Sequence, residues 1–180
     1  MFKQNPEEFV SKVSEYINEE KATIIVKHIS YREIEGKYDT DIFTLENRGK
    51  NFKDAFKAKK HIQDYVFTDG ISKKSVERKF VENIDVAEDI IVYAKLPKGF
   101  YIPTPVGNYS PDWAISFKER EIKHIYFIAE TKGSLSSLQI RPIEQAKIDS
   151  AKKLFDSLSN EKLKYEKIDS FEHLIDLIKK

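Results

Sequence analysis

One apolar run that ends in charged residues constrains this chain more than any other feature. Residues 124–132 read His-Ile-Tyr-Phe-Ile-Ala-Glu-Thr-Lys, and Gly133 follows. The apolar middle predicts a buried β-strand. A charge at the end of such a run is costly unless it is paired, exposed at the strand tip or bound to a metal ion. Glu130 is therefore the first candidate for a functional residue.

The sequence from Ser72 onward predicts alternating helices and strands. A helix with Val76, Phe80 and Ile84 on one side comes first. Three strands, a long helix from about Arg141, a fourth strand and a closing helix follow it. The strands are expected at residues 89–96, 112–117, 124–132 and 163–168, and a Pro-rich loop is expected over 103–111. The pattern indicates an α/β fold.

The first 70 residues give a weaker signal. Asn5 and Pro6 are typical of a helix start, and an apolar stripe follows over residues 9–17. The β-branched stretch over 22–34 predicts a strand, with a turn at 35–37 and a second strand near 41–43. We therefore predict two regions, a helix plus hairpin extension or linker over 1–70 and a main domain over 71–180.

Composition excludes several classes of protein. The 180 residues contain no cysteine, which removes disulfides and thiolate chemistry and fits a cytoplasmic protein. No apolar run approaches the roughly 20 residues that span a bilayer, so no membrane is expected. The six glycines do not assemble a phosphate loop, and Thr44 stands where a loop ending at Gly49-Lys50 needs its first glycine, so no nucleotide site is expected. The formal charge of +1 neither requires nor excludes a nucleic-acid partner.

A second carboxylate is expected to join Glu130. Pro111-Asp112 begins one predicted strand, and Glu130 and Lys132 end the next. Side chains two apart in a strand share a face, and Asp112 on an antiparallel neighbour could join them. Carboxylate oxygens suit Mg²⁺, and a lysine there can position or help deprotonate the attacking water. Trp113, pointing the other way, is expected to pack in the core.

The Glu-x-Lys spacing alone is weak evidence for an active site. Four other pairs have the same spacing, at residues 19 and 21, 35 and 37, 77 and 79, and 121 and 123. A solvated charged surface explains such pairs equally well. What distinguishes Glu130 is its position at the end of an apolar run.

A longer string of residues resembles a known family. It comprises Tyr93 to Phe100, Ile102 to Ile115 with its Ser-Pro-Asp-Trp, Tyr126 to Ser134 with its Glu-Thr-Lys-Gly, and Arg141 to Ile148. This string resembles the C-terminal nuclease region of type III restriction enzyme Res subunits, of the PD-(D/E)xK superfamily. The likeness is dense from about Val76 to Phe155.

The resemblance implies a fold, a chemistry and partners. It implies a restriction-endonuclease-like fold, with a central mixed β-sheet flanked by helices in the order αβββαβ. It implies a type III site-specific deoxyribonuclease that cleaves double-stranded DNA with Mg²⁺, for which Mn²⁺ can substitute. Catalysis maps onto Asp112, Glu130 and Lys132. In that family a Mod methyltransferase subunit recognises the DNA sequence. ATP serves the helicase-like domains of Res, which this chain lacks.

The resemblance also suggests a third carboxylate. Such nucleases often add an acidic residue from the first core helix, which makes Glu77 a candidate metal ligand beside Asp112 and Glu130. Glu82 is a rival. A solvated helix carboxylate is the alternative for Glu77.

Four lysines are candidates for DNA contact. Lys147 lies in the helix that follows the catalytic strand, where an ion pair with Glu144 is the alternative. Lys57, Lys59 and Lys60 belong to a basic stretch, for which a solvated basic helix is the alternative.

Two other functions stay open at this stage. One is a repair or recombination nuclease on the same core. The other is a non-catalytic DNA-binding or docking module that retains the fold.

Overall fold

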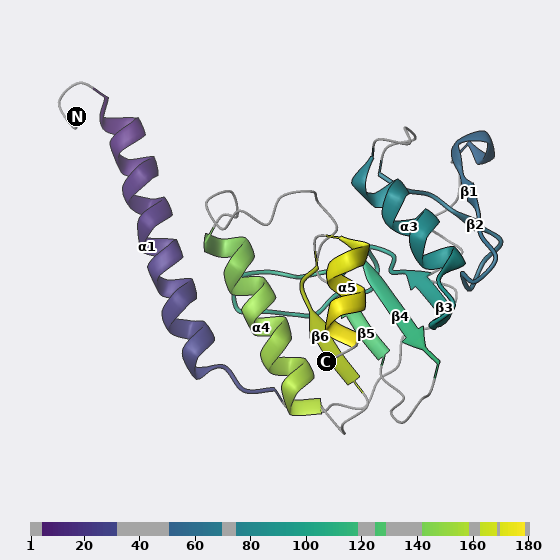
Figure 1. Ribbon diagram of the computed structural model, residues 1–180. Coiled ribbons are helices and arrows are strands. Elements are labelled where there is room, and N and C mark those ends of the chain that lie inside the picture. The colour runs from purple at the N-terminus through teal and green to yellow at the C-terminus, as the bar shows by residue number, and fades with distance from the viewer. Residues whose placement is uncertain are drawn as a thin grey trace.

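The computed structural model describes residues 5–31, 51–69, 75–118, 125–128, 142–158, 163–168 and 170–178. Figure 1 shows a mixed α/β arrangement in which helices pack against strands and one helix extends outward. No helix in these ranges is long and apolar enough to cross a membrane.

The first helix is longer than the sequence predicts. Helix α1 spans Pro6–His28, and the Asn5 side chain caps it by accepting from the Glu8 N–H at 3.1 Å. The strand predicted over 22–34 is wrong for residues 22–28, which are helical. Ala22 and Val26 lie one turn apart and pack against Ala146, so tertiary contact overrides the local β preference. The predicted turn at 35–37 and strand at 41–43 lie outside the described residues.

Residues 51–66 form a small ribbon. A short 3₁₀ turn, η1 (Phe52–Asp54), precedes β1 (Phe56–Lys57), which pairs antiparallel with β2 (Tyr65–Val66). The alternative of a solvated basic helix for this stretch is wrong, because the chain is extended beyond Asp54.

The remaining elements follow the predicted order of helix, three strands, helix, strand and helix. They are α3 (Val76–Val86), β3 (Ile90–Lys95), β4 (Trp113–Phe117), β5 (Ile125–Ile128), α4 (Pro142–Leu158), β6 (Leu163–Glu166) and α5 (Phe171–Ile178). The four strands form one sheet in chain order. Strands β3, β4 and β5 pair antiparallel, and β6 joins β5 in parallel. The outer edge of β3 is covered, because Ile62 N–H donates to the Tyr93 carbonyl and Tyr93 N–H donates to the Lys60 carbonyl, both at 3.0 Å.

The helices lie on both faces of this sheet. The face that carries Trp113, Ile115 and Phe117 packs against residues of α3 and α5. Tyr165 of β6 pairs through Phe127 with Ala114, so it points to the opposite face. There it packs against Ile148, Ala151 and Phe155 of α4. Trp113 is fully buried, which confirms its predicted core role.

Candidate active site

The described part of the site lies where β3 ends and β4 begins. Asp112 stands at a bend just before β4, half-buried, and its carbonyl accepts from the Leu96 N–H at 2.8 Å. Lys95 and Trp113 are register partners on the two strands. Asp112 is therefore held beside the end of β3, immediately before the first residue of β4.

Two predicted catalytic residues, Glu130 and Lys132, lie outside the described residues. Strand β5 is described as far as Ile128, which pairs with Trp113. The end of β5 and the start of β4 therefore lie side by side. Among the described residues, no group of three or more acidic or histidine side chains is placed to hold a metal ion.

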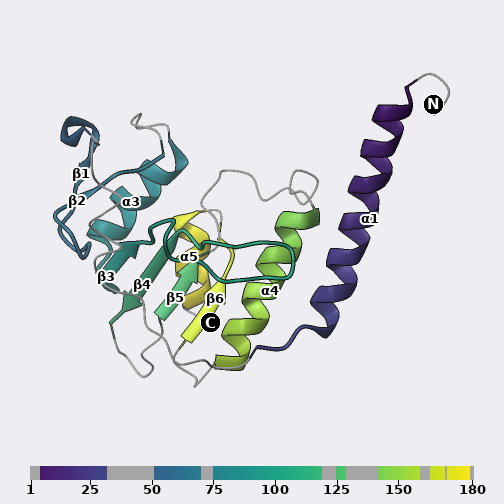
Figure 2. The same cartoon turned by 180° about the vertical axis from the view of Figure 1, so that it is seen from behind.

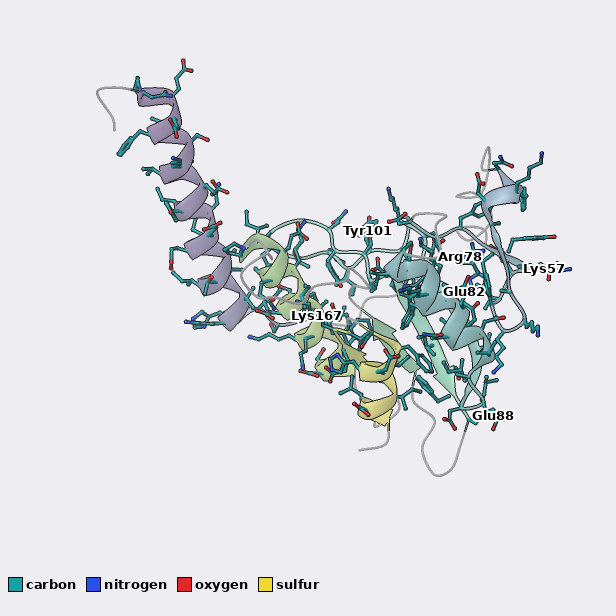
Figure 3. The ribbon with its side chains drawn as sticks, turned by 45° about the horizontal axis from the view of Figure 1, so that its top comes forward. Lys57, Arg78, Glu82, Glu88, Tyr101 and Lys167 are labelled. Carbon is teal, nitrogen blue, oxygen red and sulfur yellow. The ribbon has the colours of Figure 1, made fainter. Side chains whose placement is uncertain are left out.

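Glu77 is buried in the first turn of α3. Its Oε1 lies 2.9 Å from Lys95 Nζ, and its Oε2 accepts from the Asp69 N–H. A solvated carboxylate at this position is therefore wrong. Glu82, its rival, forms an ion pair at 3.3 Å with Arg78 of the same helix. Figure 3 shows the side chains of Arg78 and Glu82 together on α3.

Lys95 joins Glu77 to the end of β3, beside which Asp112 lies. Its ammonium also donates to the Phe67 carbonyl at 3.0 Å and lies 5.8 Å from the centre of the Trp113 ring. Sequence reasoning missed Lys95, although a signal was present. Like Glu130, it follows a run of apolar residues in the sequence, where a charge needs a partner.

A hydrogen-bond network centred on Asp85 anchors residues 59–61 to α3 and β3. Asp85 is buried and accepts from the N–H groups of Lys59 and Lys60 and from the Tyr93 hydroxyl at 3.0 Å. Burial raises the pKa of the Tyr93 hydroxyl, and the Asp85 charge adds to the effect. These groups serve as scaffold, and sequence reasoning missed Asp85.

His61 completes the same network through both of its ring nitrogens. Its Nε2 lies 3.0 Å from the backbone N of Lys95, which can only donate, so Nε2 accepts. Its Nδ1 lies 3.0 Å from both the carbonyl oxygen and the backbone N of Gln63. Burial lowers the pKa of this imidazole, opposed by the Gln63 hydrogen bond and by the Asp85 charge. His61 is therefore held neutral and structural.

The candidate DNA-binding lysines do not project as one group. Lys57 is exposed and extends outward from β1 (Figure 3), and Lys59 is exposed as well. Lys60 is half-buried, and its Nζ donates to the Ala87 carbonyl just past the end of α3. Lys147 forms the alternative ion pair with Glu144, at 3.1 Å. It lies on α4, across the sheet from Glu77.

Comparison with known proteins decides the family. The profile described as "Endonuclease domain" matches residues 59–171, more than half of the chain. The chain belongs to the endonuclease-domain family. This match contains the β3–β4 junction, the Glu77–Lys95 pair and both residues of the Glu130–Lys132 motif.

Two curated relatives connect this endonuclease domain to restriction enzymes. It is 33% identical over 104 residues to the type III restriction-modification enzyme EcoP15I Res subunit of Escherichia coli. It is 32% identical over 104 residues to the EcoPI Res subunit of Escherichia phage P1. These alignments cover 57% of this chain but only 11% of each relative. No solved structure matches significantly. The endonuclease domain is thus a distant relative of one part of the type III Res subunits.

Proposed function

We propose that this endonuclease domain hydrolyses phosphodiester bonds of double-stranded DNA, with Asp112, Glu130 and Lys132 as its active site. The observation that carries the proposal is the position of Asp112. Its bend lies beside the end of β5, and Glu130 follows β5 by two residues in the sequence. Family membership supports the reaction class.

The residues at these strand ends, Asp112 before β4 and Glu130 after β5 in the sequence, are suited to a divalent cation. Carboxylate oxygens of Asp112 and Glu130 are the ligands that Mg²⁺ prefers. When bound, Mg²⁺ would supply Lewis-acid activation of a water and neutralise charge on phosphate oxygens. Regular pairing beyond Trp113 and Ile128 would set Asp112 opposite Ala129, on the other face from Glu130. A shared site therefore requires the bend at Asp112 to turn its side chain out of that alternation.

Each proposed site residue has its own role. Asp112 and Glu130 hold the cation and orient the scissile phosphate near it. Lys132 positions the attacking water and donates to the phosphate oxygens as negative charge develops there. Glu77 is the candidate third carboxylate. Because Lys95 already balances its charge, Glu77 would have to exchange that partner for the cation.

The fold and the biological setting are proposals of the same kind. The order α3, β3, β4, β5, α4, β6, with β6 parallel to β5, supports a restriction-endonuclease-like fold for the main domain. The likeness to Res subunits supports a role for this domain within a type III restriction complex in the cytoplasm. Its partners there would be a Mod methyltransferase subunit and the ATP-driven domains of Res.

Lys57 and Lys59 are the lysines best placed to contact DNA phosphates in this proposal. Both are exposed, and neither forms an ion pair with another residue that the structure describes. A Lys57→Ala, Lys59→Ala variant should bind a DNA duplex more weakly and show a flatter dependence of log Kd on log salt. Lys118→Ala, an exposed lysine after β4, is the control. An unchanged salt slope would remove these lysines from the interface.

The decisive experiment is nicking of supercoiled plasmid in Mg²⁺ or Mn²⁺ without ATP. Asp112→Asn and Lys132→Ala should each abolish cleavage, whereas Glu82→Gln, which removes only a surface ion pair on α3, should not. Cleavage that survives in both site variants would refute this active site. If the parent chain is inactive, calorimetric Mn²⁺ titration of parent and Asp112→Asn decides whether the site binds metal. Metal-independent DNA binding would then favour the non-catalytic module.

A further inference from the structure

The loop between β3 and β4 leads directly into Asp112 and is folded back on itself. Within this loop the Ile102 N–H donates to the Tyr109 carbonyl at 2.7 Å, and the Tyr109 N–H donates to the Ile102 carbonyl at 2.9 Å. We call residues 102–109 the loop hairpin. Asp112 follows its last residue by three positions, so any constraint on the loop hairpin acts close to this carboxylate.

The loop hairpin packs on helix α4 and strand β6. Figures 1 and 2 show the teal loop between β3 and β4 extending across to α4. One buried cluster contains Ile102, Tyr109, Ile148, Ala151, Phe155 and Tyr165. This cluster lies on the sheet face opposite to that of Trp113 and α3. The loop hairpin is therefore fixed to the main domain by contacts that do not involve the pairing of β4.

A buried pair of tyrosine hydroxyls closes this contact. The hydroxyl oxygens of Tyr109 and Tyr165 lie 2.7 Å apart, so one hydroxyl donates to the other. The two rings meet edge to face with their centres 6.2 Å apart, and the Tyr165 ring is stacked on Phe155 of α4 at 5.1 Å. Because the strand and the stacked ring both restrict Tyr165, its hydroxyl is a fixed anchor for Tyr109.

Asp112 is held from two directions by these contacts. At the end of β3, the Leu96 N–H donates to the Asp112 carbonyl at 2.8 Å. In the other direction the chain passes through the fully buried Pro111 to Tyr109. Asp112 lies at a bend just before β4, so the strand pairing of β4 does not itself fix its backbone. The anchor at Tyr109 supplies a constraint that strand pairing does not.

We propose that the hydroxyl pair of Tyr109 and Tyr165 positions Asp112 for its role in the active site. This inference rests on the proposed function, since it takes the Asp112 carboxylate as a ligand of the divalent cation. Both tyrosines act through Asp112 and not by touching DNA or the cation. A metal ligand must be held within about 0.5 Å of its productive position, so a loosened loop hairpin weakens the site.

Amide hydrogen exchange of the full chain tests the positioning without any metal ion. The Leu96 N–H reports on Asp112 because it donates to the Asp112 carbonyl. Tyr165→Phe should lower the protection of Leu96 at least about threefold relative to that of Ile115, in the middle of β4. The ratio cancels any general loss of stability, which lowers the protection of both amides. An unchanged ratio would overturn the proposal.

Tyr93→Phe is the matched control for this experiment. It also removes one buried tyrosine hydrogen bond, but on the α3 side of the sheet. The ratio of Leu96 to Ile115 protection should stay unchanged in this variant. An equal fall in Tyr93→Phe and Tyr165→Phe would show a general effect of losing a buried hydroxyl and would refute the positioning role.

Calorimetric Mn²⁺ titration separates this inference from the proposed function. If Asp112→Asn abolishes Mn²⁺ binding, Tyr165→Phe should weaken it at least about threefold, and Tyr93→Phe should not. Unchanged affinity in Tyr165→Phe would then refute the positioning role alone. If the parent chain binds no Mn²⁺, or Asp112→Asn binds it equally well, the proposed metal site fails. The exchange ratio still decides in that case whether the tyrosine pair holds Asp112.

Discussion

Lys95 Nζ lies 2.9 Å from Glu77 Oε1, which ties the last residue of β3 to the first turn of α3. Glu77 is buried, and among the described residues its carboxylate is paired with this cation and with the Asp69 N–H. The pair therefore offers a direct test of whether Glu77 is retained for stability or for the proposed site.

Lys95→Met should destabilise the fold by roughly 3 kcal/mol, because it leaves a buried carboxylate without its counter-charge. Glu77→Gln should cost less, since Lys95 is the more exposed member of the pair. The double variant should recover part of the loss of Lys95→Met. Urea unfolding of the four proteins measures the coupling, and additive effects would show that the pair contributes nothing.

If Glu77 is a metal ligand, Glu77→Gln should weaken Mn²⁺ binding as well as stability. Calorimetric titration measures this, with Glu82→Gln as the control on the same helix. Unchanged Mn²⁺ affinity together with lowered stability would assign Glu77 to the scaffold alone.

Asp85→Ala should destabilise the chain by about 3 kcal/mol or more, because it leaves two backbone N–H groups and the Tyr93 hydroxyl without their acceptor. Tyr93→Phe removes only one of these hydrogen bonds and should cost about 1 kcal/mol. Urea unfolding compares the two. A larger effect of Tyr93→Phe would show that Asp85 does not organise the network.

Acidification should weaken the fold through His61. Its folded pKa is lowered below the ordinary value near 6.5, so the neutral ring is the folded form. Stability from this residue is complete above about pH 6.5 and is lost as pH falls below it, because a protonated Nε2 cannot accept from the Lys95 N–H. Unfolding free energies measured on either side of that pH should differ more for the wild type than for His61→Gln. Equal pH dependence would contradict this role.

Trp113→Phe should be tolerated better than its complete burial suggests. The buried Nε1 of Trp113 has no hydrogen-bond partner in the part of the chain that the structure describes, so removing this N–H relieves a desolvation cost. The variant should lose less than about 2 kcal/mol, whereas Trp113→Ala should lose about 3–5 kcal/mol. Similar losses in both would indicate that the N–H is satisfied, and thermal unfolding can measure them.

Local sequence predicts the elements of this chain better than it predicts their contacts. Alternation and turn residues gave the order from α3 to α5, and Pro111-Asp112 was rightly placed at a strand start, because these are local signals. The strand predicted at residue 22 failed because Ala22 and Val26 are held by Ala146, more than 100 positions away. Lys95 and Asp85 were missed for the same reason, since their partners lie on other elements. The division of the chain after residue 70 stays a prediction.

The hydrogen bonds of the ribbon have a consequence for cooperativity. The backbone of residues 59–62, the His61 ring and the Phe67 carbonyl satisfy polar groups of Asp85, Tyr93 and Lys95. Opening this segment would therefore leave Asp85, near the end of α3, and Tyr93 and Lys95 of β3 without these hydrogen-bond partners. We expect the amide protons of Lys59, Lys60 and Ile62 to exchange with solvent together with those of β3, as parts of one unfolding unit. A fragment that begins after these residues would lack the hydrogen-bond partners of Asp85, Tyr93 and Lys95.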